Sequence, residues 1–268
     1  MIDFQNVSFS YGEESSGGGI RNVNLTINTG EFVLLTGESG CGKTTITRLV
    51  NGLVPHYYEG NLEGDVLLDG KSVSDTPLYD LAAMVGSVFQ NPKSQFFNVD
   101  TDSELAFACE NLGYPQEDIL KRIDRTVSDY HIEDLMGRSV FALSGGEKQK
   151  IACASSSVLL PGIMVLDEPS SNLDMAAIDD LRQVLSLWKK QGKTILIAEH
   201  RLYYLHDLAD RVLYVKDGEI EREYTPAEFD SLSDSTRKEM GLRPFSLSKL
   251  KPANQYQAHT GVPFTKSR

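Results

Sequence analysis

The chain has 268 residues, of which 40% are hydrophobic and 24% are charged, a composition typical of one globular domain with room for a smaller lobe. No stretch approaches the ~20 consecutive apolar residues of a membrane span, and the first residues lack the features of a secretory signal. The formal net charge of −12 argues against a dedicated nucleic-acid-binding protein, because such proteins use Lys and Arg to neutralise phosphates. We therefore expect a cytoplasmic protein that meets a membrane only through partners.

The hydrophobic pattern, taken in chain order, predicts strands that alternate with helices. Residues 2–11 are expected to form an edge strand, followed by a loop at 13–19. Further strands are predicted at 23–27, 32–36, 66–68, 85–89, 163–166 and 194–198, helices at 44–53 and 176–190, and a hairpin at 212–223. This alternation predicts an α/β core with a mainly parallel sheet.

Two segments fall outside this alternation. Residues 102–160 are mostly helical and interrupt the core between strands, which predicts a separate inserted lobe. The segment 243–268 contains Pro, Ser and Lys without periodicity and is expected to be a poorly ordered tail or a linker.

A phosphate-binding loop is predicted directly after the strand at 32–36. The residues that match G-x-x-x-x-G-K-[ST] are Gly37, Glu38, Ser39, Gly40, Cys41, Gly42, Lys43 and Thr44. The glycines let backbone N–H groups point at the β- and γ-phosphates, and the following helix turns its positive end to the same anion. Lys43 supplies a charge, the Thr44 hydroxyl is placed to ligate Mg²⁺, and Thr45 is placed to reach the α-phosphate. A chance match would occur in on the order of one per cent of chains this long.

The strand at 163–166 ends in two acidic residues, Asp167 and Glu168. A buried strand would bring Asp167 beside the phosphate loop, where its carboxylate can hold Mg²⁺ directly or through water. Glu168 can then polarise the attacking water as a general base, an effect worth ~10²–10⁴ in rate. Considered alone, the pair is explained equally well as a strand end with two solvated acids.

A second candidate anion site lies at the start of a predicted helix, where Leu143–Glu147 reads Leu-Ser-Gly-Gly-Glu. Ser144 is a favourable N-cap, but capping alone leaves Gly145 and Gly146 unexplained. A phosphate-binding helix start explains all three, because it combines a hydroxyl, bare N–H groups and the helix dipole.

Together these motifs resemble the ATP-binding cassette (ABC) family. The residues that carry the resemblance are Gly37–Thr44, Gln90, Leu143–Glu147, Ile163–Glu168, Ser171–Asp174 and His200. The resemblance covers about residues 1–225. It implies a P-loop NTPase (RecA-like) core, an N-terminal antiparallel β-subdomain and a helical subdomain at about 91–160, within a cassette at 1–242. In that family two cassettes sandwich two ATP molecules head to tail, so Lys43 and Ser144 of one chain would serve different ATP molecules, and a lone cassette would hydrolyse ATP poorly.

The resemblance implies further roles, residue by residue. Tyr11 would stack on adenine, although a surface tyrosine at a strand end is the alternative. Gln90 would contact Mg²⁺ or water and report to a membrane partner, and Asp174 would cross the interface between cassettes. His200 would bridge the γ-phosphate and Glu168, so that Glu168, His200 and Gln90 form the catalytic group.

Two residues depart from the family's usual signature: Glu147 replaces the commoner Gln, and Lys150 replaces the commoner Arg. The first adds a negative charge near a nucleotide and is expected to weaken the contact to ribose. Ser144 and Gly146, which carry the phosphate contacts, are intact, so hydrolysis is still expected.

The segment after Gln90 is similar to the energy-coupling factor (ECF) importers of bacteria and archaea. It reads Asn91-Pro92-Lys93-Ser94-Gln95-Phe96-Phe97 and, together with Gln90, matches Q-N-P-x-x-Q-x-F. The resemblance implies an ATP-hydrolysing subunit of an importer for a vitamin or metal ion, at the inner face of the cell membrane. Its partners would be a second cassette, a transmembrane T component and a substrate-binding S component. Phe96 and Phe97 would line a docking groove, or alternatively would be core residues of the lobe.

The run Val54–Gly60 further resembles fused, two-cassette members of that group, which would make the chain one half of a tandem protein. The partner cassette would otherwise be an identical chain or a paralogue. A soluble ABC ATPase acting on DNA or ribosomes is the alternative function, which the acidic charge and the lack of a sustained heptad disfavour. A phosphate-loop kinase would leave Leu143–Glu147 and Asp174 without a role.

Cys41 lies inside the phosphate loop, beside Lys43 and at a helix N-terminus, and both features favour a thiolate. We expect alkylation of Cys41 to block ATP binding and Mg·ATP to protect the protein. The alternative is a small residue that fits a tight turn. The other two cysteines, Cys109 and Cys153, lack metal-site spacing and are expected to be reduced.

Overall fold

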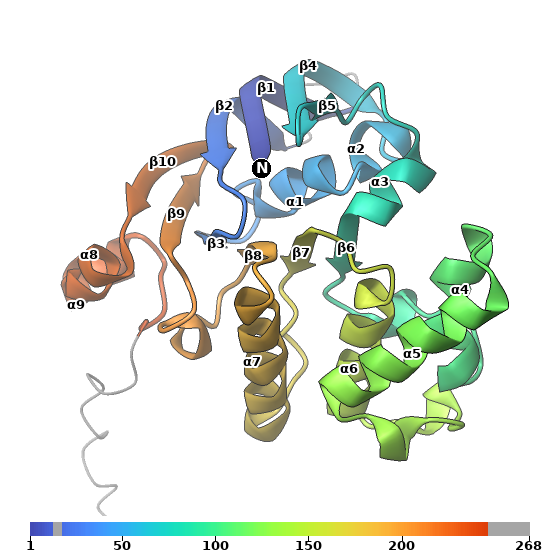
Figure 1. Cartoon of the computed structure of the whole chain (residues 1–268). Coiled ribbons are helices and arrows are strands. Elements are labelled where there is room, and N and C mark those ends of the chain that lie inside the picture. The colour runs from blue at the N-terminus through green and yellow to red at the C-terminus, as the bar shows by residue number, and fades with distance from the viewer. Residues whose placement is uncertain (13–17, 246–268) are drawn as a thin grey trace, which may run out of the picture.

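The computed structural model describes residues 1–12 and 18–245. Most of the predicted loop at 13–19 and of the predicted tail at 243–268 therefore lies outside the described residues. Two β-sheets with helices between and beside them make up the described chain (Figure 1). This arrangement confirms the predicted α/β class with an antiparallel β-subdomain and an inserted helical part.

The smaller sheet is antiparallel, with four strands in the order β2-β1-β4-β5. Its strands are β1 (Ile2–Tyr11), β2 (Gly19–Ile27), β4 (Gly60–Leu68) and β5 (Lys71–Ser72). The expectation that residues 2–11 form an edge strand is wrong, because β1 pairs with both β2 and β4. Alternating burial along a strand reports one buried face, and it is the same for edge and interior strands of a sheet that is covered on one side.

The larger sheet has six strands in the order β10-β9-β3-β8-β7-β6. They are β3 (Phe32–Thr36), β6 (Val85–Val88), β7 (Ile163–Asp167), β8 (Thr194–Ala198), β9 (Arg211–Lys216) and β10 (Glu219–Tyr224). All neighbouring pairs are parallel except β9 with β10. Because parallel strands end at the same edge, the segments after β3, β6, β7 and β8 meet there.

The larger sheet is buried on both faces, which explains its continuous apolar strands. On one face, Val33 and Leu35 pack with α1 (Lys43–Val50) and with the smaller sheet. On the other face, Phe32 and Leu34 pack with α6 (Gly145–Ser157) and α7 (Met175–Lys190). Helix α1 thus lies between the two sheets (Figure 1).

The inserted helices form the predicted lobe between β6 and β7. Besides α6, its elements are α4 (Thr101–Asn111), α5 (Gln116–Tyr130) and the 3-10 helices η1 (Pro92–Ser94), η2 (Glu133–Leu135) and η3 (Val140–Ala142). Two shorter helices, α2 (Leu53–His56) and α3 (Leu78–Met84), connect α1 and β4 to β6. The lobe is joined to α7 through Trp188, whose indole N–H donates to the Tyr130 hydroxyl.

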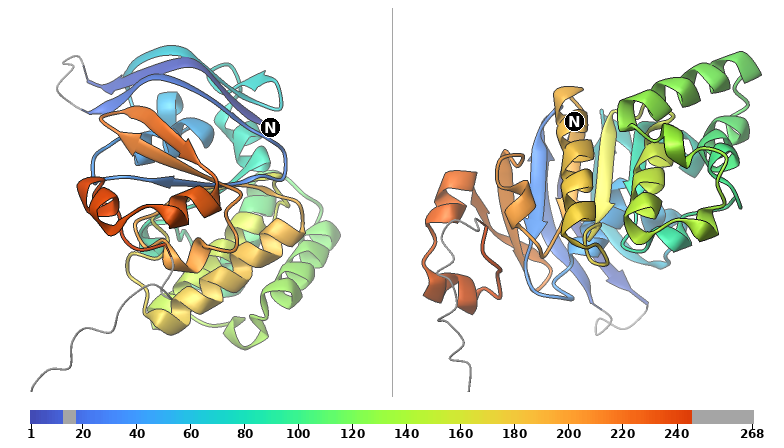
Figure 2. Two further views of the ribbon diagram at one scale, coloured as in Figure 1. Left: turned by 90° about the vertical axis from the view of Figure 1, so that its left-hand side faces the viewer. Right: turned by 90° about the horizontal axis from the view of Figure 1, so that it is seen from below.

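The chain after β10 was not assigned from the sequence and forms α8 (Pro226–Ser231) and α9 (Asp234–Glu239). These helices lie at the β10 end of the larger sheet, opposite the helical lobe (Figure 2). Phe245 is fully buried, with its ring against those of Phe229 and His206, so the described chain stays packed beyond α9. No helix in the described ranges is both long and apolar enough to cross a membrane.

Candidate nucleotide site

The predicted phosphate loop lies at the carboxyl end of β3, wedged between neighbouring backbones. A Cβ on Gly37 would lie 2.1 Å from the Val215 carbonyl oxygen, and Gly37 has φ of 150°. A Cβ on Gly42 would lie 3.0 Å from the Gly19 carbonyl oxygen. Both positions therefore require glycine, as a loop that curls tightly around a phosphate does.

Lys43 lies under this loop, with its side chain almost fully buried. Its ammonium donates to the carbonyl oxygens of Gly37 and Glu38, at 2.9 and 2.8 Å. The Cys41 sulfur lies 3.6 Å from the same nitrogen and is itself buried. The packing supports the small-residue explanation of Cys41, while its reactivity stays a prediction.

Thr44 and Asp167 meet across the gap between α1 and β7. The Thr44 hydroxyl donates to the Asp167 carboxylate at 3.2 Å. Burial raises the pKa of Asp167, while the hydrogen bond from Thr44 opposes that shift. A hydroxyl and a carboxylate at this spacing suit two neighbouring ligands of Mg²⁺, which takes octahedral oxygen ligands at ~2.1 Å and keeps several waters. The described residues hold no group of three or more His, Cys, Asp or Glu that could bind a metal alone, so phosphate and water oxygens would complete the shell.

Glu168 lies between two side chains that come from separate loops. Gln90 Nε2 donates to one carboxylate oxygen at 3.0 Å, and His200 Nε2 lies 3.1 Å from the other. Burial, reinforced by the charge of Lys43, lowers the pKa of His200, which favours the neutral imidazole. The backbone of Glu168 has φ of 46°, an uncommon conformation for a residue with a side chain. The structure therefore brings together Glu168, His200 and Gln90, which were predicted as the catalytic group.

Tyr11 is directed at the start of α1. Its hydroxyl lies 3.3 Å from the Thr45 hydroxyl and accepts from Arg48 at 3.0 Å. Its ring contacts Phe9 and Tyr58 edge to face. Tyr11 is therefore tied to the phosphate-loop helix, and stacking on adenine stays a prediction.

The second predicted anion site lies at the start of α6. The Ser144 hydroxyl accepts from Glu147 N, and the Glu147 carboxylate accepts from Ser144 N at 2.7 Å. Arg138 donates to the other oxygen of Glu147 at 2.9 Å. The negative charge that Glu147 introduces is thus paired within the same chain, and these hydrogen bonds lower its pKa.

The two signature glycines have different environments. A Cβ on Gly146 would lie 2.8 Å from the Ala177 Cβ, so Gly146 permits close packing of α6 on α7. A Cβ on Gly145 would meet only the Asn172 carbonyl oxygen, at 3.9 Å. Gly146 therefore has a packing explanation that the sequence did not reveal, whereas Gly145 remains available for a ligand.

A cavity of about 610 Å³ opens in front of this helix start. Its lining includes Ser144, Gly145, Gly146, Glu147 and Asp174. Asp174 also caps α7 by accepting from Ala177 N at 2.9 Å. No residue of the phosphate loop Gly37–Thr44 lines this cavity.

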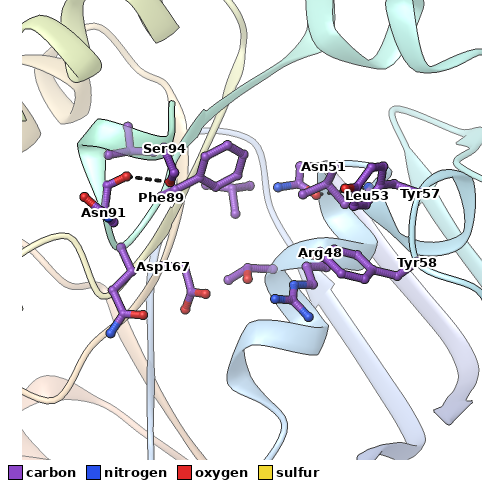
Figure 3. Close-up of a pocket in the computed structure, with 13 residues that line it drawn as sticks. Arg48, Asn51, Leu53, Tyr57, Tyr58, Phe89, Asn91, Ser94 and Asp167 are labelled. Carbon is purple, nitrogen blue, oxygen red and sulfur yellow. Dashed lines mark hydrogen bonds between the residues drawn. The ribbon is translucent and has the colours of Figure 1, made fainter. Parts of the chain in front are cut away.

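Another cavity, of about 530 Å³, separates α1 and α2 from the segment after β6. Arg48, Asn51, Leu53, Tyr57 and Tyr58 form one wall, and Phe89, Asn91 and Ser94 face them from the other side (Figure 3). The Arg48 guanidinium lies 4.1 Å from the centre of the Tyr58 ring.

Phe96 and Phe97, which were considered together in the sequence, differ in the structure. Phe96 packs against the core, whereas Phe97 is 74% exposed and stacks on Phe107. The buried Glu104 carboxylate accepts from the backbone N–H groups of Phe97 and Asn98, at 3.0 and 2.8 Å. The backbone that carries the exposed Phe97 ring is thus fixed by the Glu104 carboxylate, and the ring itself by stacking on Phe107.

Three charged residues beside the site were not identified from the sequence: Arg138, Glu199 and Arg201. Glu199 and Arg201 flank His200 in the chain, and their loop follows β8 at the same sheet edge as Glu168. This adjacency to a predicted switch residue was the one available signal. Arg138 gives no such signal, because its pairing with Glu147 depends on the turn before α6.

The fold and the site define a phosphate-loop nucleotide-binding protein. A family model described as ABC transporter matches residues 20–171. A relative from Pyrococcus abyssi, provisionally named an ABC transporter ATP-binding protein, is 40% identical over 229 residues, which are 85% of this chain and 81% of the relative. The chain therefore belongs to the ABC transporter family as one of its ATP-binding cassettes.

Other relatives are longer. One from Treponema denticola, with the same provisional name, is 47% identical over 94% of this chain and 51% of its own length. One from Methanosarcina mazei is 36% identical over 98% of this chain and 45% of its own length. The chain thus spans about half the length of these curated relatives.

Solved structures agree with this family. The cbiO1 protein of Clostridium perfringens, described as part of the ABC transporter complex cbiONQ, has a TM-score of 0.76 and 27% identity, over 88% of this chain and 93% of that chain. The cassette MJ0796, described as a dimer in a post-hydrolysis state with ADP and Pi, has a TM-score of 0.72 and 26% identity, over 84% of this chain and 99% of that chain.

Proposed function

We propose that this chain binds and hydrolyses ATP to energise an ECF-type ABC importer for a vitamin or metal ion. The observation that carries the chemistry is the contact of Gln90 and His200 with opposite oxygens of Glu168, next to the Thr44–Asp167 pair. In this arrangement Glu168 is placed to take a proton from water, and the neutral His200 orients the carboxylate. Mg²⁺, held by Thr44 and Asp167 with Gln90 nearby, would neutralise phosphate charge.

ATP would lie between two cassettes. Lys43 and the loop Gly37–Thr44 would bind the phosphates of one ATP, while Ser144 and Gly145 would face the ATP of the partner cassette. Glu38 and Ser39 of the loop line a cavity together with Glu168 and His200, whereas Ser144 and Gly145 line a different one, and this separation supports the head-to-tail pairing. The partner is a second cassette, either an identical chain, a paralogue or a fused half, as the longer relatives allow.

The membrane partner would dock between the core and the helical lobe, at the inner face of the membrane. The cavity between Tyr58 and Asn91 lies beside Gln90, which contacts Glu168, so occupation of this cavity is placed to affect the catalytic group. Phe97 presents an exposed ring on the same lobe. The similarity to cbiO1 supports an ECF-type partner, with T and S components.

The chemistry is tested with Glu168→Gln, measured for ATP turnover and for binding of a fluorescent ATP analogue. We expect turnover to fall by ~10²–10⁴ while binding is retained, because the amide keeps the shape but cannot accept the proton. Glu31→Gln, at the opposite end of β3, is the matched control and should leave both values unchanged. Normal turnover in Glu168→Gln would place the general base elsewhere.

A further inference from the structure

The residues on both sides of His200 make contacts that the proposed chemistry does not use. Glu199 is a carboxylate with 1% of its surface exposed. One of its oxygens accepts from Ser170 N at 3.0 Å and from the Tyr204 hydroxyl at 2.9 Å. The other accepts from the backbone N–H groups of His200 and Arg201, at 2.7 and 3.0 Å.

A buried carboxylate of this kind is stable only if its lone pairs are satisfied, because desolvation of a charge costs several kcal/mol. Here every donor comes from one of two loops at the sheet edge, the loop after β7 or the loop after β8. Burial raises the pKa of the Tyr204 hydroxyl well above its ordinary value, so it remains a donor. Three of these donors, in His200, Arg201 and Tyr204, lie in the same segment as Glu199, and the hydrogen bond from Ser170 N joins that segment to the loop after β7.

Arg201 makes a second connection between the same loops. Its guanidinium donates to the Leu173 carbonyl oxygen at 2.9 Å, directly before Asp174. The backbone adds a third, since Glu168 N donates to the Ala198 carbonyl oxygen at 2.8 Å. The segment 168–174 is therefore tied to the His200 loop at its beginning and near its end.

We propose that Glu199 and Arg201 are positioning residues that hold His200 and the segment 168–174 as one unit, so that ATP turnover depends on them while ATP binding does not. The proposal rests on the proposed function, because Glu168 and His200 are its reacting groups. The unit joins the general base to Asp174, the residue that would face the partner cassette. Among the described residues, neither Glu199 nor Arg201 makes a hydrogen bond to the phosphate loop. The Lys43 ammonium is instead held by carbonyl oxygens of that loop.

Glu199→Gln is the sharpest test, because the amide fits the same space but carries an NH₂ group. If the NH₂ group faces Ser170 and Tyr204, the Ser170 N–H loses its acceptor, while the Tyr204 hydroxyl can turn to accept from the amide. If the NH₂ group faces the other way, the N–H groups of His200 and Arg201 both lose their acceptor, so at least one buried N–H is left unpaired in either orientation. We expect kcat to fall about 10- to 100-fold, with KM and the Kd of a fluorescent ATP analogue within about 2-fold of wild type. Glu31→Gln is the matched control, since Glu31 is another largely buried carboxylate with a partner, Arg211, and lies away from His200.

Two further variants grade the effect. Tyr204→Phe removes one donor and should lower kcat by less than Glu199→Gln. Arg201→Met removes the contact to Leu173 and should lower kcat about 3- to 10-fold. Arg182→Met, which removes only a surface contact to Asp207, is its control and should match wild type.

Hydrogen exchange followed by mass spectrometry measures how firmly the segments 168–174 and 199–204 are held, without relying on activity. In Glu199→Gln, peptides that cover 168–174 and 199–204 should exchange faster, while those that cover Gly37–Thr44 stay unchanged. An unchanged kcat in both Glu199→Gln and Arg201→Met, or a loss of ATP binding that parallels the loss of kcat, would overturn the proposal. If Glu168→Gln abolishes turnover while these variants keep it, the positioning role fails and the proposed function stands. If Glu168→Gln keeps turnover, the general base lies elsewhere and the proposed chemistry at Glu168 fails.

Discussion

Glu147 illustrates how a departure from the usual signature is accommodated by its neighbours. Its carboxylate accepts from Ser144 N and from Arg138, so the added charge is compensated before any nucleotide arrives. The expectation of a weakened ribose contact considered Glu147 alone, whereas in the structure Arg138 pairs with its carboxylate. Any effect on nucleotide binding should thus depend on the Arg138–Glu147 pair as a whole.

Glu147→Gln should lower the unfolding free energy by less than about 1 kcal/mol at pH 7, because the pair is only partly buried. The folded pKa of Glu147 is lowered, so its contribution is present above its usual value of 4.5 and is lost as pH falls through the lowered value. The difference between wild type and variant should therefore shrink in acid. Urea unfolding at pH 7 and about pH 3 measures it, and a difference that grows in acid would contradict this assignment.

Gly37–Thr44 and the pair Asp167–Glu168 could be predicted from the sequence because each lies in a contiguous motif. Gln90 and His200 were predicted only from the resemblance to the ABC family, and the structure places both beside Glu168. Glu199 could not be predicted in the same way, because its donor Ser170 meets it only after β7 and β8 pair. Contacts across a sheet edge leave no local pattern.

At the scale of elements, the start of α6 separates a packing role from a binding role. Gly145→Ala should leave thermal stability unchanged or slightly higher, since it replaces glycine in open space within a helix. It should still reduce ATP-dependent dimerisation, because the new methyl group enters the cavity lined by Ser144. Gly146→Ala should instead lower stability by about 1–3 kcal/mol, through its clash with Ala177.

Thermal unfolding and light scattering with and without Mg·ATP distinguish these two glycines. Equal losses of stability in both variants would show that Gly145 also serves packing. Unchanged dimerisation in Gly145→Ala would remove it from the proposed ATP contacts.

Trp188 links the helical lobe to α7 and reports on that junction, since it is the only tryptophan in the chain. Tyr130→Phe should destabilise the protein by about 1–3 kcal/mol, because the buried indole N–H loses its acceptor. Denaturant unfolding followed by Trp188 emission measures this loss of stability. Phe97→Ala, at an exposed position, is the control, with a change expected within about 0.5 kcal/mol.

Prediction of elements from the sequence succeeded for strands whose residues are all buried. It failed where the position of a strand depends on which other strands pair with it. Strands β3 and β8 have the predicted bounds, because a run of apolar residues between polar turns has few alternatives. The placement of β1 at an edge was wrong, because alternating burial does not count neighbouring strands. Helices α8 and α9 are short and exposed, so their apolar signal is carried by little more than Phe229.

At the scale of the whole molecule, the proposed head-to-tail pairing divides each ATP site between two cassettes. Glu168→Gln should therefore form a stable dimer with Mg·ATP, because ATP joins two cassettes and is not consumed. Size-exclusion chromatography with light scattering measures this, and Lys43→Ala, which loses the phosphate contact, should remain monomeric. A Glu168→Gln protein that stays monomeric with ATP would contradict pairing between identical chains and leave a different second cassette as the partner.

The central claim is that this ATP-binding cassette energises a membrane importer, and co-purification from native membranes tests it most directly. The tagged wild-type chain and Phe97→Asp would be recovered in mild detergent, and the proteins that accompany them identified by mass spectrometry. We expect the wild type to recover a multi-pass membrane protein together with a second cassette, and Phe97→Asp to lose the membrane protein by about 10-fold or more. Recovery of ribosomal or DNA-associated proteins alone would contradict the transport function and leave only the ATPase chemistry.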